Sequence, residues 1–227
     1  MTIPATHAEV EQIYLNAELN QCRSICLTSC QSGEGVTALT MALTERYLLA
    51  GYHTALVDLN MFHPSFVTAE LGNTQPSLLQ HNHSLRCFTG ITVPKDTSEH
   101  LLYKRPDFLQ KAMQTWLGQY ERVVVDTSPL LNVNRNNIPA QCIASACDGV
   151  ILVVMAGHTS TLQVQAAMDL LKQSNISLLG TILNCRDKPT LASEICREIN
   201  RIPLLPERWR ERIKERVMNN EYLNATT

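Results

Sequence analysis

Short, unbroken apolar runs recur along the chain, and each is followed by a longer segment with helical periodicity. Three of these runs, "VVVD", "GVILVV" and "LLGTILN", lack the polar alternation of a strand with one face in water. Continuous apolar strands are typical of parallel sheets covered on both faces, and strand–helix alternation builds such sheets. The sequence therefore predicts an α/β fold with a doubly wound, mainly parallel sheet flanked by helices.

The turn residues between these segments set the bounds of the expected elements. Strands are expected at 24–29, 54–59, 85–91, 122–126, 150–155 and 178–184. Helices are expected at 8–19, 36–50, 107–119, 138–146, 159–174, 191–200 and 207–219. A chain of 227 residues suits one α/β domain with a buried core. We expect a single domain over 1–227, with an N-terminal helix at about 8–19, a core at about 22–200 and a C-terminal helix at about 206–219.

The composition, with 44% hydrophobic and 18% charged residues, is typical of a soluble globular protein. No stretch approaches the ~18 consecutive apolar residues of a membrane span, and the opening "MTIPATHAEVEQ" lacks the features of a signal peptide. A formal charge of −2 gives no electrostatic reason to expect nucleic-acid binding. The eight cysteines favour buried free thiols over a disulfide scaffold, because scaffolds of that kind belong to short secreted chains. We expect a cytoplasmic protein.

Ligands of doubly wound sheets bind beyond the carboxyl ends of the strands. The segment "SCQSGEGVTALT" leaves the first expected strand and enters a helix. Gly33 and Gly35 allow the backbone to turn and to present N–H groups to a phosphate at the helix start, where the helix dipole also favours an anion. The hydroxyl of Thr37 is placed to bind magnesium. The expected nucleotide-contacting residues of this loop are Gly33, Glu34, Gly35, Val36, Thr37 and Ala38.

Acidic residues end two other expected strands: Asp58 in "VDLNMFHPS" and Asp126 in "VVVDTSPL". Because the carboxyl ends of parallel strands share one edge of a sheet, both carboxylates are expected near the glycine-rich loop. A second interpretation stays open, in which each aspartate only caps the turn that follows its strand. Two histidines, His81 and His83, lie in "HNHS", where a surface loop is a better interpretation than a metal site.

The three segments, in this order, resemble the Walker A, Walker A′ and Walker B motifs of the bacterial tyrosine kinases (BY-kinases), a family within the ParA- and MinD-like P-loop ATPases. The resemblance runs from about Glu11 to about Asn200 and includes the blocks "AGYHTALVDLNMFHPS", "QYERVVVDTSPL", "CDGVILVVMAGHTS" and "LLGTILNC". It implies a P-loop NTPase-like fold, ATP or ADP with magnesium as cofactor, and a role in capsule or exopolysaccharide synthesis.

The resemblance also assigns roles to single residues. Asp58 and Asp126 correspond to the catalytic acids, and Thr37, Asp58 and Asp126 to the magnesium ligands. Asn184 corresponds to a position that contacts the adenine base. For Asn184 a plainer role remains open, because an asparagine after a strand also satisfies the backbone of a turn.

The nucleotide-binding motifs depart from the family pattern at two places. The family has a lysine where this chain has Val36, and the second loop lysine of MinD and ParA relatives falls at Gln31. No lysine or arginine lies between Arg23 and Arg46. Asn60 replaces the second Walker A′ acid. Losing one preorganised electrostatic group costs about 10²–10³ in rate, so phosphoryl transfer is expected to be severely impaired.

Other departures affect the rest of the Walker A′ motif, the substrate tail and self-association. The motif continues with Phe62, His63 and Pro64, where the family has basic residues before its proline. BY-kinases end in a tyrosine-rich tail, whereas "NNEYLNATT" holds only Tyr222. The family's assembly motif is Glu-x-x-Arg-x-x-Arg, and here Glu11 is present but Tyr14 and Ala17 replace the two arginines. The sequence therefore leaves open whether the chain forms a homo-oligomer.

Together the departures favour a pseudoenzyme, which binds nucleotide weakly or not at all and acts as a regulator or scaffold of exopolysaccharide or capsule biosynthesis and export. The expected partner is a membrane polysaccharide co-polymerase or another kinase-like component, which would hold the protein at the inner membrane peripherally. Two alternatives remain: an active tyrosine kinase or ATPase with a non-standard loop, and a ParA- or MinD-type positioning ATPase.

Overall fold

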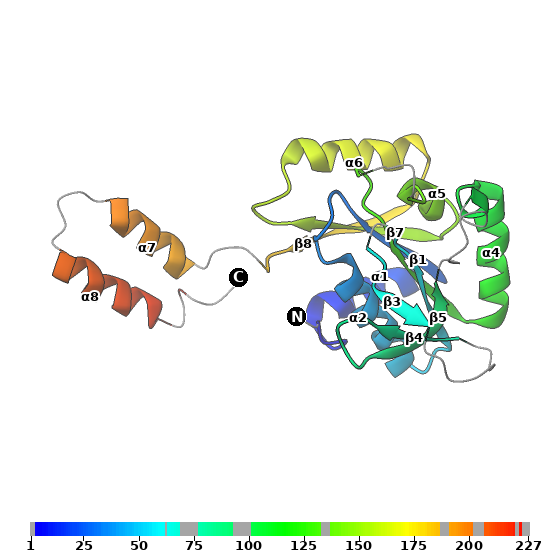
Figure 1. Ribbon diagram of the computed structural model, residues 1–227, viewed down its shortest axis with the longest axis horizontal. Helices are drawn as coiled ribbons and strands as arrows, with labels where there is room; N and C mark the ends of the chain where they lie inside the picture. The colour runs from blue at the N-terminus through cyan, green and yellow to red at the C-terminus, as the bar shows by residue number, and fades with distance from the viewer. Residues whose placement is uncertain are drawn as a thin grey trace. The chain divides into compact units, whose positions relative to one another are not determined.

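The computed structural model describes residues 3–61, 63–68, 77–92, 101–132, 137–186, 191–201, 207–220 and 223. The chain divides into two compact units, one made of Met1–Val154 with His158–Asn184 and the other of Met155–Gly157 with Cys185–Thr227. The first contains a single sheet with helices on both faces (Figure 1).

The sheet of the first unit has the strand order β3-β4-β5-β2-β6-β1-β7-β8. Its strands are β1 (Ser24–Ser29), β2 (Thr54–Leu59), β3 (Phe66–Thr68), β4 (Leu78–His81), β5 (Cys87–Thr92), β6 (Arg122–Thr127), β7 (Gly149–Met155) and β8 (Leu178–Asn184). The helices of this unit are α1 (Ala8–Leu19), α2 (Val36–Leu49), α4 (Pro106–Gln119), α5 (Ala140–Ala144) and α6 (Thr161–Gln173). β1 pairs in parallel with β6 and β7, and β2 with β5 and β6. The predicted α/β fold with a mainly parallel sheet is confirmed.

Alternate side chains of the central strands pack against different helix layers. Ile25 and Leu27 of β1 lie in one core cluster with residues of α1 and α2, whereas Cys26 lies in a second cluster with residues of α4, α5 and α6. Every residue of β1, β2 and β7 is buried. The unbroken apolar runs therefore mark strands with helices on both faces, as Figure 1 shows.

Two parts of the sheet differ from the sequence-based expectation. β3 and β4 were not predicted; they pair antiparallel with each other, and β4 also pairs antiparallel with β5. His81 is the last residue of β4, so the prediction that it lies in a loop is wrong. β8 reads as a continuous apolar run but is only half-buried, and Leu183 is 61% exposed, because β8 is the last strand at the edge of the sheet.

Several element bounds shift for local reasons. β5 begins at Cys87 rather than at Leu85, which is 93% exposed in the turn after β4. α6 begins at Thr161 because Ser160 is its N-cap, completed by Gln163 as a capping box. α5 is shorter than expected and begins after Pro139. The eight cysteines are free, but the expectation that they are buried holds only for Cys22, Cys26 and Cys30: Cys87 is exposed and the other four are half-buried.

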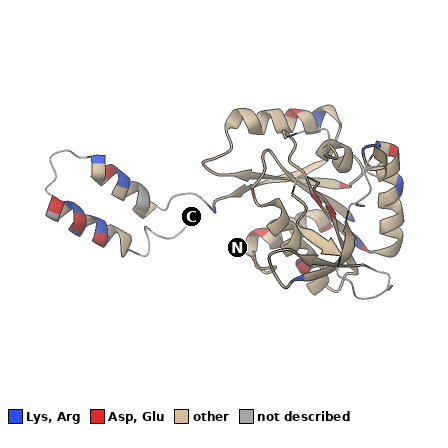
Figure 2. Cartoon of the chain, in the orientation of Figure 1, with Lys and Arg blue, Asp and Glu red and all other residues tan. Residues whose placement is uncertain are grey.

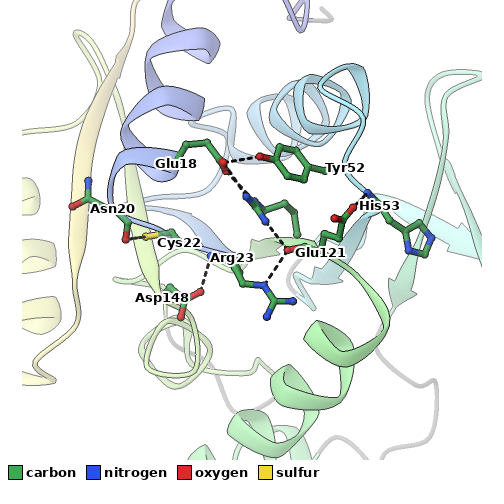
Figure 3. A network of polar contacts seen from close by, with 9 residues as sticks. Glu18, Asn20, Cys22, Arg23, Tyr52, His53, Glu121 and Asp148 are labelled. Atoms are coloured by element: carbon green, nitrogen blue, oxygen red, sulfur yellow. Dashed lines mark hydrogen bonds and ion pairs between the residues drawn. The ribbon is translucent and has the colours of Figure 1, made fainter.

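A polar network closes the amino ends of β1, β2 and β6, at the opposite end of the strands from the glycine-rich loop (Figure 3). The guanidinium of Arg122 donates to both carboxylate oxygens of Glu18, at 2.9 and 2.8 Å, and lies 4.0 Å from the ring centre of Tyr52. Asp148 accepts hydrogen bonds from the backbone N–H groups of Arg23 and Ser24. These contacts fix α1 and the strand starts relative to one another.

The second unit contains α7 (Leu191–Arg201) and α8 (Glu207–Met218), which pack against each other. Acidic and basic residues alternate along α8 (Figure 2), and the side chain of Trp209 is 65% exposed. Among the described residues, no helix combines the length and the apolar character needed to cross a membrane. Phe62, Pro206 and Tyr222 lie outside the described residues.

Candidate nucleotide site

The carboxyl ends of β1, β2 and β6 bring together the three motifs found in the sequence. Asp58 and Asp126 are register partners on the adjacent strands β2 and β6, and Leu27 of β1 is the partner of Asp126 on the other side. The loop that follows β1 enters α2, whose first turn carries Thr37. The Thr37 hydroxyl donates to Asp126 Oδ2 at 2.6 Å. The predicted convergence of these three residues is thus present.

The glycine-rich loop has the backbone conformation that the sequence predicts. Gly33 and Gly35 have φ values of +87° and +98°, in the left-handed region that favours glycine. Gly35 is the N-cap of α2 and provides no side-chain cap, and the first turn of α2 contains no acidic residue. The helix therefore begins without a side-chain oxygen on its N–H groups, as an anion-binding terminus requires.

Asp126 is fully buried and only partly satisfied. Its Oδ1 atom has no hydrogen-bond partner among the described residues, although Oδ2 accepts from Thr37. Burial, and next the charge of Asp58, raises the pKa of the Asp126 carboxyl well above its usual value. An orphaned, buried carboxylate oxygen is costly. A cation would satisfy it.

Asp58 is also buried but accepts three backbone hydrogen bonds, from the N–H groups of Asn60, Ser65 and Phe66 at 3.0, 3.1 and 3.3 Å. Burial raises its pKa to about 6, although these hydrogen bonds act in the opposite direction. Two carboxylates and one hydroxyl form a set of hard oxygen donors of the kind that magnesium prefers. The residues present therefore fit a magnesium ion.

Asn60 joins two loops of the site. Its Oδ1 atom accepts from the His63 N–H at 3.2 Å and from the Ser128 hydroxyl at 3.3 Å. The loops after β2 and β6 are thus linked through a neutral amide oxygen, at the position where the resemblance noted in the sequence implies an acid. The sequence did not single out Ser128, although it lies two residues after Asp126 in the same strand-end segment.

The side chain of Val36 belongs to the apolar core rather than to the open side of the loop. It is 7% exposed and lies in the cluster that contains Leu27 and Leu39. The isopropyl group of Val36 therefore packs against the core and brings no positive charge to the loop. Ala38 is half-buried in the same first turn of α2.

Glu34 is buried, and its charge is engaged by the protein. Its Oε2 atom accepts the Cys30 N–H at 2.9 Å, and Oε1 accepts the hydroxyl of Thr159. The Nδ2 group of Asn184 donates to the Glu34 carbonyl at 2.9 Å. Asn184 therefore reaches the glycine-rich loop, and its contact with a base stays a prediction.

Glu11, for which the sequence left a role in self-association open, is paired within its own chain. Arg46 of α2 donates to both carboxylate oxygens of Glu11, at 2.5 and 2.9 Å, and its guanidinium lies 3.8 Å from the ring centre of Tyr14. Among the described residues, no group of three or more His, Cys, Asp or Glu side chains forms a separate metal site.

No protein-family model matches the sequence. Curated relatives include the tyrosine-protein kinase CpsD of Streptococcus agalactiae, 26% identical over 176 residues that cover 70% of this chain and 74% of the relative. The putative tyrosine-protein kinase CapB of Staphylococcus aureus is 26% identical over 187 residues, which cover 76% of this chain and 78% of the relative.

Solved structures show the same fold. The kinase domain of VpsO is 27% identical with a TM-score of 0.58, covering 79% of this chain and 92% of that one. The chimerical protein CapA2B2 is 22% identical with a TM-score of 0.60, covering 78% and 83%. A cobyrinic acid a,c-diamide synthase of Mycobacterium smegmatis, solved with an ATP analogue and magnesium, is 18% identical with a TM-score of 0.51, covering 81% and 84%. The resemblance to the bacterial tyrosine kinases is confirmed.

Proposed function

We propose that this chain, a relative of the bacterial tyrosine kinases, is a regulator or scaffold of capsule or exopolysaccharide biosynthesis and export that keeps a nucleotide site but whose phosphoryl transfer is impaired. The observation that carries the nucleotide part is the contact of Thr37 with Asp126 at the start of α2, beside a buried carboxylate oxygen that has no partner in the described part of the chain. The pathway part is supported by the relatives, which are tyrosine-protein kinases such as CpsD and CapB.

The loop residues Gly33 to Ala38 would hold the phosphates of ATP or ADP through backbone N–H groups and the start of α2. Thr37, Asp58 and Asp126 would hold magnesium, which supplies positive charge to the phosphate oxygens when it is bound. Asp58 and Asp126 are also the residual candidates for catalysis. Burial raises the pKa of both carboxyl groups, so the ion-free site disfavours two neighbouring negative charges.

The proposed impairment has two physical reasons. Transfer of a phosphoryl group needs cations where negative charge develops, and the chain has no lysine or arginine from residue 24 to residue 45. Val36 fills the lysine position with a buried apolar side chain. Asn60 also lacks the charge and the proton-accepting capacity of a carboxylate.

Calorimetric titration with Mg-ATP and Mg-ADP, together with a steady-state phosphate-release assay, tests this proposal. We expect measurable binding without steady-state hydrolysis, and we expect Asp126→Ala to weaken the binding. Thr161→Ala, in the exposed first turn of α6, is the matched control and should bind as the wild type does. A hydrolysis rate like that of active relatives, lost in Asp126→Ala, would favour the second candidate.

That second candidate is an active kinase or ATPase with a non-standard loop. It is favoured by the intact arrangement of Thr37, Asp58 and Asp126, which is the part of the site that handles magnesium. A cation from another protein would then have to replace the missing lysine. Hydrolysis that appears only after a partner is added would identify this case.

We also propose a protein partner of the same machinery, either a membrane polysaccharide co-polymerase or another kinase-like component. Such a partner would bring a chain of this kind to the inner face of the membrane. The apolar framework of the sheet and the loop geometry are well formed although the charge of the loop is lost, and this supports a retained binding role.

A further inference from the structure

The shape of the glycine-rich loop is held by the buried side-chain carboxylate of Glu34, whereas the phosphates are expected to meet the backbone N–H groups of the loop. The side chain of Glu34 is 3% exposed. Its Oε2 atom accepts the N–H of Cys30 at 2.9 Å, which closes the loop on itself across residues 30–34. Its Oε1 atom accepts the hydroxyl of Thr159. Both carboxylate oxygens therefore bind donors of the protein.

Thr159 belongs to a well-anchored segment between β7 and α6. The next residue, Ser160, is the N-cap of α6: its hydroxyl accepts the Gln163 N–H at 3.3 Å, and its own N–H donates to Gln163 Oε1 at 2.8 Å. Capping fixes the backbone at the helix start. The contact from Thr159 thus ties the loop to a rigid point outside it.

A second tie reaches the loop from the end of β8. Asn184 Nδ2 donates to the Glu34 carbonyl at 2.9 Å. A Cβ atom built on Gly35 would lie 2.6 Å from the same Nδ2 atom, so the two segments are packed without spare room. The loop is therefore held at Glu34 in two ways. Thr159, which follows β7, contacts the side chain of Glu34, and Asn184, at the end of β8, contacts its backbone carbonyl.

We propose that Glu34 is a positioning residue that holds the loop in its phosphate-receiving shape before the ligand arrives, with Thr159 as its anchor. This inference rests on the proposed nucleotide binding. Preorganised N–H groups bind an anion without first being reordered, so a loop without lysine gains most from being held in place. The Glu34 carboxylate can hold the loop in this way because both of its oxygens accept hydrogen bonds from the protein itself.

Three substitutions of threonines test the tie. Thr159→Val removes the hydroxyl and keeps the shape, Thr159→Ser restores a hydroxyl, and Thr161→Val is the matched control on the exposed start of α6. Hydrogen exchange of segment 30–37 is measured without nucleotide, and affinity is measured with Mg-ATP and with adenosine. We expect faster exchange and about tenfold or more weaker Mg-ATP binding only in Thr159→Val, with adenosine affinity unchanged.

Each outcome decides the proposal. Recovery in Thr159→Ser supports it. Exchange and Mg-ATP affinity equal to those of Thr161→Val would overturn it, and so would a change in only one of the two readouts. If the wild-type protein binds no Mg-ATP, the nucleotide function fails, and the exchange of segment 30–37 alone decides whether Glu34 orders the loop.

Discussion

At the scale of single residues, the site is dominated by two carboxyl groups that the fold removes from water. Asp58 and Asp126 are 3% and 0% exposed, and they lie side by side on adjacent strands. Removing a carboxylate from water disfavours its charged form, and a neighbouring carboxylate adds to this effect. The ligand-free site is therefore electrostatically unfavourable at neutral pH, and its charge should be visible in the stability of the protein.

The free energy of unfolding is predicted to fall as pH rises, in the absence of magnesium. A carboxyl group whose pKa is higher in the folded than in the unfolded chain binds its proton more tightly when folded, so stability is lost as pH rises through this window. For Asp58 the window runs from 3.8 to about 6. The loss from this group is on the order of 3 kcal/mol, at about 1.4 kcal/mol for each unit.

Urea unfolding from pH 4 to pH 8 in the presence of a chelator measures this slope. Asp126→Asn should gain stability relative to wild type as pH rises, and the two proteins should converge near pH 4. Asp169→Asn on α6 is the control and should follow the wild-type slope. If the difference in free energy of unfolding between Asp126→Asn and wild type did not change with pH, it would contradict the raised pKa of Asp126.

Restoring both missing charges is predicted to strengthen nucleotide binding. In Val36→Lys with Asn60→Asp, the lysine stem can follow the apolar contacts of Val36, and the new carboxylate can accept the hydrogen bonds that Asn60 accepts from His63 and Ser128. A charge-assisted hydrogen bond contributes about 1.5–3 kcal/mol, so Mg-ATP affinity should rise at least about tenfold. Calorimetry measures the gain.

The single substitution Asn60→Asp is the informative control for that experiment. It adds a third acid beside Asp58 and Asp126 without a compensating cation, so its affinity for Mg-ATP should lie below that of the double variant. A folded double variant that binds no better than wild type would show that the loop is not arranged as the family alignment implies.

At the scale of elements, how well a segment could be predicted depended on its length and on the turn residues that bound it. The bounds of α1, β1, β2 and β8 agree with the sequence-based expectation to the residue, because glycine, asparagine and polar turns punctuate these apolar runs. β3 and β4 have three and four residues and pair antiparallel at the edge, so they leave no periodic signal. The exposure of β8 could not be predicted, because a strand's place in the sheet is a tertiary property.

The contact between β2 and β5 leads to a prediction at this scale. Gly90 is the register partner of Leu56, and a Cβ atom on Gly90 would lie 1.9 Å from the Leu56 carbonyl oxygen. Gly90→Ala should therefore push β5 away from β2 and lower the free energy of unfolding by about 2–4 kcal/mol. Gly180→Ala on β8, where no atom of the described residues lies within 4 Å of the added atom, should stay within about 0.5 kcal/mol of wild type. Equal denaturation midpoints for the two variants would refute this account.

At the scale of the whole molecule, the fold and the place of the site could be predicted together. A parallel sheet gathers its strand ends at one edge, so naming the strands also predicted that Thr37, Asp58 and Asp126 meet. The contact of Glu34 with Thr159 could not be predicted, since it joins polar residues distant in sequence and neither carries a periodic pattern. The same reason hid the pairing of Glu11 with Arg46.

Binding to the proposed partner is predicted to be independent of ATP, because a surface retained for scaffolding does not need the phosphate loop to be occupied. The tagged full chain would be co-purified from membranes with and without Mg-ATP, and equal recovery of the partner is expected. A deletion strain carrying the folded Asp126→Ala variant should make normal polysaccharide. ATP-dependent recovery, together with failed complementation, would show instead that the nucleotide site carries the function.

The bidentate pair between Arg46 and Glu11 also bears on how copies of this chain could associate. A second copy that offered a cation to Glu11 would compete with the guanidinium of Arg46, which is tethered to Glu11 within the same chain. A tethered group acts at an effective concentration of the order of millimolar. At micromolar protein the internal partner therefore prevails, and self-association through this carboxylate would need either crowding of many copies on one platform or a competing group that displaces Arg46 from the ring of Tyr14.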